Sequence, residues 1–210
     1  MTKTKTDIID QGLKAALELA GESSWDAITL SAIAERAGLT LSDFQNVADK
    51  DGLADHVEAY FDAAMNEGSF SEDETPRTRL FDVLMLRFEE MEDDRAGLVS
   101  LMEWRSRQPA RLLNLLSARR QTASWALTCA GLDASGKLPK PIRLTALTWV
   151  IGQAERAWRK ETSPDFSRTM AALDGELRRM DERADWITSF GRKKAAPTDS
   201  AEQTASDPSA

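Results

Sequence analysis

Apolar residues recur at spacings of three and four along most of this 210-residue chain, which is the period of an amphipathic α-helix. The clearest case lies near the C-terminus, where the apolar positions are Phe166, Met170, Leu173, Leu177 and Met180. Alternating β-branched runs, which indicate strands, are almost absent. Hydrophobic residues make up 41% of the chain and charged residues 30%, a composition typical of a folded protein. The sequence therefore predicts an all-α protein.

Capping and turn residues predict four helices in the N-terminal part, over 8–20, over 30–37, from 41 and from about 51. Gly38 is placed to end the second helix, because glycine tolerates the left-handed backbone that follows a helix. Thr40 is expected to start the third helix, with Asp43 three residues later as the second half of a capping box. Leu41 and Phe44 are the side chains expected to anchor this third helix in the core.

Two positions where Ser or Thr is followed by Pro predict helix starts in the C-terminal part. A Ser or Thr followed by Pro is typical of a helix N-terminus, so we expect helices to begin at Thr75-Pro76 and at Ser163-Pro164. Further helices are predicted over 95–107, from Pro109 and over 142–160, with a loop at 131–141. Residues 191–210 show no apolar period and are predicted to form a disordered tail.

The chain offers little for catalysis or for metal binding. It has one cysteine, Cys129, and one histidine, His56, so a disulfide within the chain, a zinc site or a histidine-based triad is not expected. Phosphate-binding glycine loops and nucleophile-elbow motifs are absent. The many Asp and Glu residues are expected on helix surfaces as solvated charge. We therefore expect a binding protein without a cofactor and without enzymatic activity.

No apolar run approaches the ~20 residues that cross a bilayer, and the N-terminal residues lead into an amphipathic segment instead of an apolar signal core. We therefore expect a cytoplasmic protein without stable membrane insertion.

The stretch from Trp25 to Leu53 predicts two short helices joined by a glycine turn. It reads WDAITLSAIAERAGLTLSDF and continues, after four residues, with DKDGL. It resembles the DNA-binding domain of TetR-family transcriptional regulators. The resemblance implies a three-helix domain with a helix-turn-helix over residues 1–50, followed by a helical domain over 51–190 that binds a small ligand and dimerises.

A helix-turn-helix places its second helix in the major groove of DNA, where side chains near the helix start meet the base edges. Gln and Asn can each form paired hydrogen bonds to adenine, and a lysine at the start of the next helix would contact a phosphate. The residues expected to contact DNA are Thr29, Thr40, Ser42, Gln45, Asn46 and Lys50.

The charge of this region is unusual for a DNA-binding domain. Residues 1–65 contain five Lys and Arg against twelve Asp and Glu, which leaves a net charge of −7. Phosphate neutralisation supplies most non-specific DNA affinity, so this charge weakens binding. The family usually has aromatic and basic residues where Gln45, Asn46 and Val47 stand in this sequence.

A second resemblance lies near the other end of the chain. The segment RAWRKETSPDFSRTMAALDGELRR, Arg156 to Arg179, is similar to the C-terminal region of TetR-fold accessory proteins of ubiquinone biosynthesis. Those proteins bind an isoprenoid lipid and a partner enzyme instead of DNA. Two functions therefore remain open: a transcriptional regulator whose DNA binding is controlled by a small apolar ligand, or a lipid-binding accessory protein that does not bind DNA.

The C-terminal helices carry candidates for a ligand pocket and for a dimer interface. Met and aromatic side chains adapt to a flexible apolar ligand, although ordinary core packing explains them equally well. The ligand candidates are Met85, Phe88, Met102, Trp104, Trp125 and Trp149, with Arg87, Arg105 or Glu103 to orient a polar head group. Apolar stripes on the last two helices either close the chain's own core or face a second subunit of a homodimer. The residues expected at such an interface are Val150, Ala154, Met170, Leu173 and Leu177.

Overall fold

The computed structural model of the chain describes residues 3–71, 73–134 and 136–195. Within these ranges it contains nine α-helices, one 3-10 helix and no strand, which confirms the predicted all-α fold. The elements are α1 Lys5–Glu22, α2 Leu30–Arg36, α3 Leu41–Phe44, α4 Lys50–Asp62, the 3-10 helix η1 Ala63–Glu67, α5 Pro76–Glu90, α6 Arg95–Ser106, α7 Pro109–Cys129, α8 Lys140–Trp158 and α9 Ser167–Ala195.

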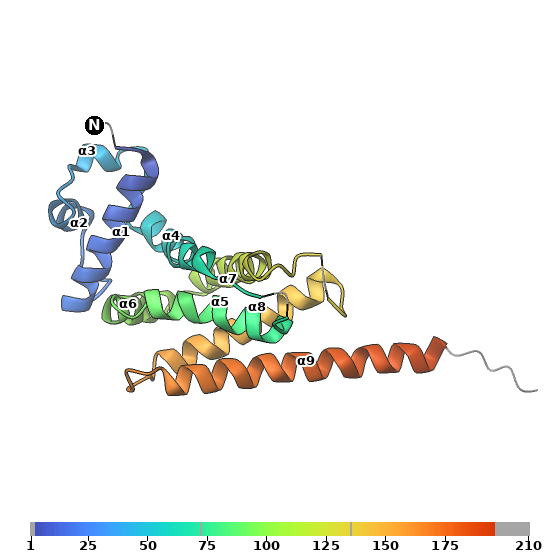
Figure 1. Cartoon of the computed structure of the whole chain (residues 1–210). Helices are drawn as coiled ribbons and strands as arrows, with labels where there is room; N and C mark the ends of the chain where they lie inside the picture. Colours follow the sequence, from blue (N-terminus) through green and yellow to red (C-terminus); the bar gives the residue numbers. More distant parts are fainter. Residues whose placement is uncertain (1–2, 72, 135, 196–210) are drawn as a thin grey trace, which may run out of the picture.

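Helices α1 to α3 form a small unit at one end of the molecule, and α4 leads from it into a longer helical body (Figure 1). Helix α9 runs along the outside of that body against α8, and its C-terminal end lies far from α3. No helix among the described residues is long and apolar enough to cross a membrane.

Helices α2 and α3 begin where the sequence predicts, and α2 ends one residue before its predicted end. The Thr29 hydroxyl accepts a hydrogen bond from the Ala32 backbone N–H, and Gly38 adopts a left-handed φ of 63° after α2. The capping box is present, because the Thr40 N–H donates to Asp43 at 2.8 Å and the Asp43 N–H donates to Thr40 at 3.3 Å. These local hydrogen bonds position the helix-turn-helix.

Helix α3 consists of a single turn, and this shortness overturns one sequence prediction. Phe44 is buried, with its ring packed directly over Gly12, whereas Leu41 is 53% exposed. After Phe44 the backbone turns sharply, with Gln45 extended and Asn46 at a left-handed φ of 61°. A one-turn helix has only one inward position, which Phe44 occupies, so the expectation that Leu41 also faces inward was wrong.

The start of α9 also differs from the prediction. The Ser163 hydroxyl donates to the Asp165 carboxylate at 2.5 Å, Phe166 adopts a left-handed φ of 55°, and the helix begins only at Ser167. The carboxylate of Glu161 instead binds the helix start, accepting from the Thr169 N–H at 2.9 Å and from the Ser163 N–H at 3.1 Å. Although burial opposes ionisation, these hydrogen bonds lower the pKa of Glu161 to about 2.

At its other end α9 continues to Ala195, past the predicted boundary at 191, and residues 196–210 of the predicted tail lie outside the described residues.

The N-terminal unit contacts the body chiefly through the crossing of α1 with α6. Gly97 on α6 lies against the backbone of Leu17 on α1, so closely that an added Cβ would overlap the Leu17 carbonyl group. Glycine is required here because two helix backbones approach without room for a side chain. The orientation of the helix-turn-helix is therefore fixed by direct backbone contact with α6.

Candidate nucleic-acid interface and the charged network behind it

Three of the predicted DNA contacts gather on one exposed surface. Ser42, Gln45 and Asn46 are all exposed and line a surface hollow of about 570 Å³ beside the turn that follows α3. Leu41 and Val47 contribute apolar side chains to the same hollow. Amide and hydroxyl groups in this arrangement can hydrogen-bond base edges, and the exposed leucine can contact a thymine methyl group.

The two threonines among the predicted contacts serve mainly as helix caps. The Thr40 hydroxyl donates to the Asp43 carboxylate at 2.8 Å, and the Thr29 hydroxyl binds the backbone of α2. Hydrogen bonds from Thr40 lower the pKa of Asp43, so Asp43 stays ionised beside the reading surface. Both threonine side chains are exposed, but their hydroxyls already have partners within the chain.

The side chain of Lys50 is half-buried and bonded to the backbone of its own unit. Its ammonium donates to the Ile28 carbonyl at 2.9 Å and approaches the Asp26 carbonyl at 3.4 Å, which ties the start of α4 to the turn before α2. Burial lowers the pKa of Lys50. The structure thus gives Lys50 a structural partner that sequence reasoning did not anticipate.

Other basic side chains of the N-terminal unit also have acidic partners within the chain. Arg36 holds Glu22 through two hydrogen bonds of 2.8 and 2.9 Å, and Lys14 lies 3.8 Å from Asp94. Lys3 and Lys5, at the start of α1, are exposed. Lys3 lies close enough to Asp43 to contribute to its lowered pKa, which places this lysine near the start of α3.

Helix α6 links this unit to the body through polar and aromatic contacts. The backbone N–H of Trp25 donates to the Ser100 hydroxyl at 2.8 Å, and the ring centroids of Trp25 and Trp104 lie 5.9 Å apart. Arg107, just after α6, pairs with Asp26 in the same turn before α2. A shift of α6 would therefore move the N-terminal unit.

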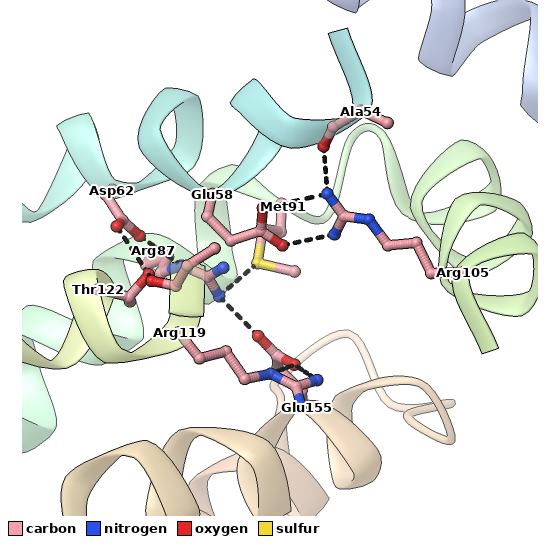
Figure 2. Close-up of polar contacts among 10 residues, drawn as sticks. Ala54, Glu58, Asp62, Arg87, Met91, Arg105, Arg119, Thr122 and Glu155 are labelled. Carbon is pink, nitrogen blue, oxygen red and sulfur yellow. Dashed lines mark hydrogen bonds and ion pairs between the residues drawn. The ribbon is translucent and has the colours of Figure 1, made fainter. Parts of the chain in front are cut away.

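Behind the helix-turn-helix, two carboxylates one turn apart on α4 bind two buried arginines of the body (Figure 2). Glu58 pairs with Arg105 of α6 at 2.6 Å, and Asp62 pairs with Arg87 of α5 at 2.8 Å. The Thr122 hydroxyl of α7 also donates to Asp62 at 2.8 Å. Burial raises the pKa of Asp62, while Arg87 opposes this effect.

The network continues to α8 through Glu155. Arg87 is 1% exposed and lies 3.5 Å from Glu155, to which Arg119 of α7 also donates at 2.8 Å. Glu58, Asp62 and Glu155 are buried, so the expectation of solvated surface charge was wrong for them. Their burial depends on arginines from other helices, although the four-residue spacing of Glu58 and Asp62 was visible in the sequence.

The six ligand candidates do not converge on one cavity. Met85 and Phe88 are buried in the core, Met102 is half-buried, and Trp104 packs against Trp25. Trp125 and Trp149 are exposed on α7 and α8. Four surface hollows stand out among the described residues, and other side chains line all of them. The ligand roles stay predictions.

The five dimer candidates lie between α8 and α9 of the same chain. Val150, Ala154, Leu173 and Leu177 are buried there, and Met170 is half-buried beside Phe81 of α5. In these positions they hold α8 and α9 together, and their part in a dimer stays a prediction. Within the described residues, no three His, Cys, Asp or Glu side chains are placed to hold a metal ion.

Comparison with known proteins relates the fold to a family of regulators. The structure is similar to that of a TetR transcriptional regulator from Nitrosomonas europaea ATCC 19718, with a TM-score of 0.67 and 20% sequence identity over 85% of this chain and 98% of that chain. It is also similar to a TetR transcriptional regulator from Rhodococcus sp. RHA1, with a TM-score of 0.58 and 21% identity over 82% of this chain and 97% of that chain. No family sequence model and no curated protein sequence matches. The chain therefore has the TetR fold, as its resemblance implied.

Proposed function

We propose that the chain is a cytoplasmic transcriptional regulator that binds operator DNA through α3 and the turn that follows it. The observation that carries the proposal is an exposed polar group formed by Ser42 on α3 and by Gln45 and Asn46 on the turn that follows it. Both helices of this helix-turn-helix begin at a threonine N-cap. The left-handed conformation of Asn46 presents its amide next to that of Gln45 on one surface. This arrangement supports direct reading of adenine-containing sites.

Only a few basic side chains are available to contact DNA phosphates in this proposal. Lys3 and Lys5 are exposed at the start of α1, whereas Arg36 and Lys50 already have partners within the unit. With a net charge of −7 over residues 1–65, non-specific binding is weak and discrimination rests on base contacts. Replacing Lys3 and Lys5 with Ala should therefore weaken binding to all DNA sequences about equally.

The proposal includes control of DNA binding by a small apolar ligand and a homodimeric assembly. A ligand entering beside Met102 of α6 would displace α6, and α6 contacts the N-terminal unit through Ser100. Because palindromic operators require two reading units, a second copy would pack on the outer face of α8, where Trp149 is 57% exposed. Native mass spectrometry tests both points. The mass of a dimer would support the homodimeric assembly, and apolar molecules that co-purify with the protein would support the ligand.

The reading residues are tested by substitution. Gln45→Ala combined with Asn46→Gly removes both amides and keeps the left-handed backbone at residue 46. We expect operator binding in a fluorescence-anisotropy titration to weaken about 30-fold or more, because each good base contact contributes about 1–3 kcal/mol. Gln121→Ala, at an exposed position on α7, is the matched control and should bind as the unchanged protein does. Equal binding by all three proteins would exclude these residues as DNA contacts.

The bonds that the basic side chains make within the chain favour a second candidate function. In this alternative the chain is an accessory protein that binds a lipid and a partner enzyme instead of DNA. Lys50 bonded to the Ile28 carbonyl and Arg36 bonded to Glu22 suit a helix-turn-helix kept for its shape. Absence of DNA binding at ~50 mM salt, together with isoprenoid lipid extracted from the purified protein, would favour this candidate over the regulator.

A further inference from the structure

The charge of the chain is divided very unevenly between its parts. Residues 104–160 contain eleven Lys and Arg but only two acids, Asp133 and Glu155, in a chain whose net charge is −8. Glu155 is buried and neutralised by Arg87 and Arg119. Arg105, Arg107 and Lys137 pair with acids outside this range. The remaining bases still leave the surface formed by α7 and α8 basic, whereas the helix-turn-helix unit is acidic. Such asymmetry within one chain is typical of proteins that bind an anionic surface.

Three leucines are exposed on the first half of α7, in the middle of this basic region. Leu112 is 41% exposed, Leu113 68% and Leu116 52%, although leucine is usually buried. Leu113, Leu116 and Arg120 follow at i, i+3 and i+7, so they share one side of the helix. We call Leu112, Leu113, Leu116 and Arg120 the leucine–arginine face.

Helix α8 adds bases beside this face. The helices α7 and α8 are antiparallel neighbours, because a short loop joins them and Arg119 pairs with Glu155. Arg159 follows directly after α8 and is exposed, at the end of α8 that lies toward the start of α7 because the two helices are antiparallel. Arg120 lies 3.5 Å from Thr145 of α8, which joins the two helices at the other end of the face. The exposed leucines of α7 thus lie on a helix flanked by exposed arginines, Arg120 on α7 and Arg159 after α8.

We propose that the leucine–arginine face docks the protein on an anionic lipid surface. Leucine side chains insert at the boundary of head groups and acyl chains, and arginines beside them pair with lipid phosphates. A second copy packed in a two-fold arrangement on the leucine–arginine face of α7 itself would bring the arginine of that face against its own copy, which like charges disfavour. The exposed side chains of the face are leucines and not the aromatic residues on which nucleic-acid bases stack. This binding does not depend on whether α3 reads DNA.

The test is co-sedimentation of the full chain with vesicles of phosphatidylcholine alone or with about 30% phosphatidylglycerol, at ~50 and ~200 mM salt. The proposal predicts binding to the anionic vesicles that weakens with salt, and little binding to the neutral ones. Leu113→Ser with Leu116→Ser should lower binding about tenfold or more. Ile187→Ser is the matched control, because Ile187 is also exposed, at 42%, but lies on α9 outside the leucine–arginine face.

Three results would overturn the proposal. The first is equal binding to neutral and anionic vesicles, and the second is equal binding by the Leu113/Leu116 variant and the unchanged protein. The third is loss of self-association in that variant by analytical ultracentrifugation, which would make the face an interface between copies. The same variant is also titrated with operator DNA, which keeps the test of lipid docking separate from the test of DNA binding. If the protein does not bind DNA, the result with the vesicles still stands.

Discussion

The N-terminal unit and the helical body are stabilised by different kinds of interaction. In the N-terminal unit, hydrogen bonds between residues three apart fix α2 and α3, as with Thr40 and Asp43. In the body, arginines bind carboxylates distant in sequence, as Arg87 does with Asp62 and Glu155. The reading surface can therefore form locally, while its orientation relative to the body depends on buried tertiary contacts.

The largest expected effect is at the buried network of the body. Arg87→Met removes the charge that faces Asp62 and Glu155 and leaves both carboxylates buried without that partner. We expect a loss of about 3–5 kcal/mol in the free energy of unfolding, measured by urea denaturation. The triple variant Arg87→Met, Asp62→Leu and Glu155→Met should recover much of this loss, because no unpaired charge remains except that of Arg119. A small loss in Arg87→Met alone would contradict the network's role.

The second effect concerns the junction between the two regions. Gly97→Ala places a methyl group against the Leu17 backbone and forces α6 away from α1, at an expected cost of about 1–3 kcal/mol. Gly175→Ala in α9 is the matched control, because its added Cβ meets nothing within 4 Å. In the middle of a helix that change should stabilise by about 0.5–1 kcal/mol. Opposite shifts in melting temperature check the pair, and equal shifts would show that the junction is not tight.

The third effect is a pH dependence in the body. The pKa of Glu161 is lowered from 4.5 to about 2 in the folded protein, so its contribution to stability is present above pH 4.5 and is lost as the pH falls toward about 2. Glu161→Gln should destabilise by about 1–2 kcal/mol at neutral pH and flatten the pH dependence of stability in that window. Unfolding between pH 2 and 6 measures both quantities. An unchanged pH profile would mean that Glu161 does not hold the start of α9.

The smallest effect is local to the N-terminal unit. Thr40→Ala removes the hydroxyl that caps α3 and should cost about 1 kcal/mol. Thr75→Ala removes an equivalent cap from α5 in the body and serves as the comparison. Thr40→Ala should weaken operator binding as well as stability, whereas Thr75→Ala should affect stability alone. Intact operator binding in Thr40→Ala would show that α3 keeps its shape without this cap.

Local signals predicted the N-terminal unit well because they act within one turn of helix. Gly38 and Thr40 each perform the role that their residue type predicts. Leu41 was misplaced because the length of α3 depends on the sharp turn at Gln45 and Asn46. The length of α3 was hard to predict because Gln45 is a good helix former, although Asn46 is a residue type that favours turns and the left-handed backbone.

The body was predicted in its helices but not in its interior. Glu58 and Asp62 look like surface residues until Arg105 and Arg87 are known to lie opposite them, and those arginines come from other helices. The start of α9 was misplaced because Ser163-Pro164 carries a typical helix-start signal, yet Glu161 binds the helix start instead. The exposure of Trp125 and Trp149 also depends on tertiary packing, and their ligand roles stay predictions.

The central claim is that the surface around Ser42, Gln45 and Asn46 reads DNA despite its acidic surroundings. The most direct measurement is fluorescence anisotropy of the full chain with its own upstream promoter DNA and with a scrambled duplex, at ~50 and ~200 mM salt. The account predicts sub-micromolar binding to the promoter that weakens with salt, and much weaker binding to the scrambled duplex. Equal binding to both duplexes, or none at ~50 mM salt, would contradict it.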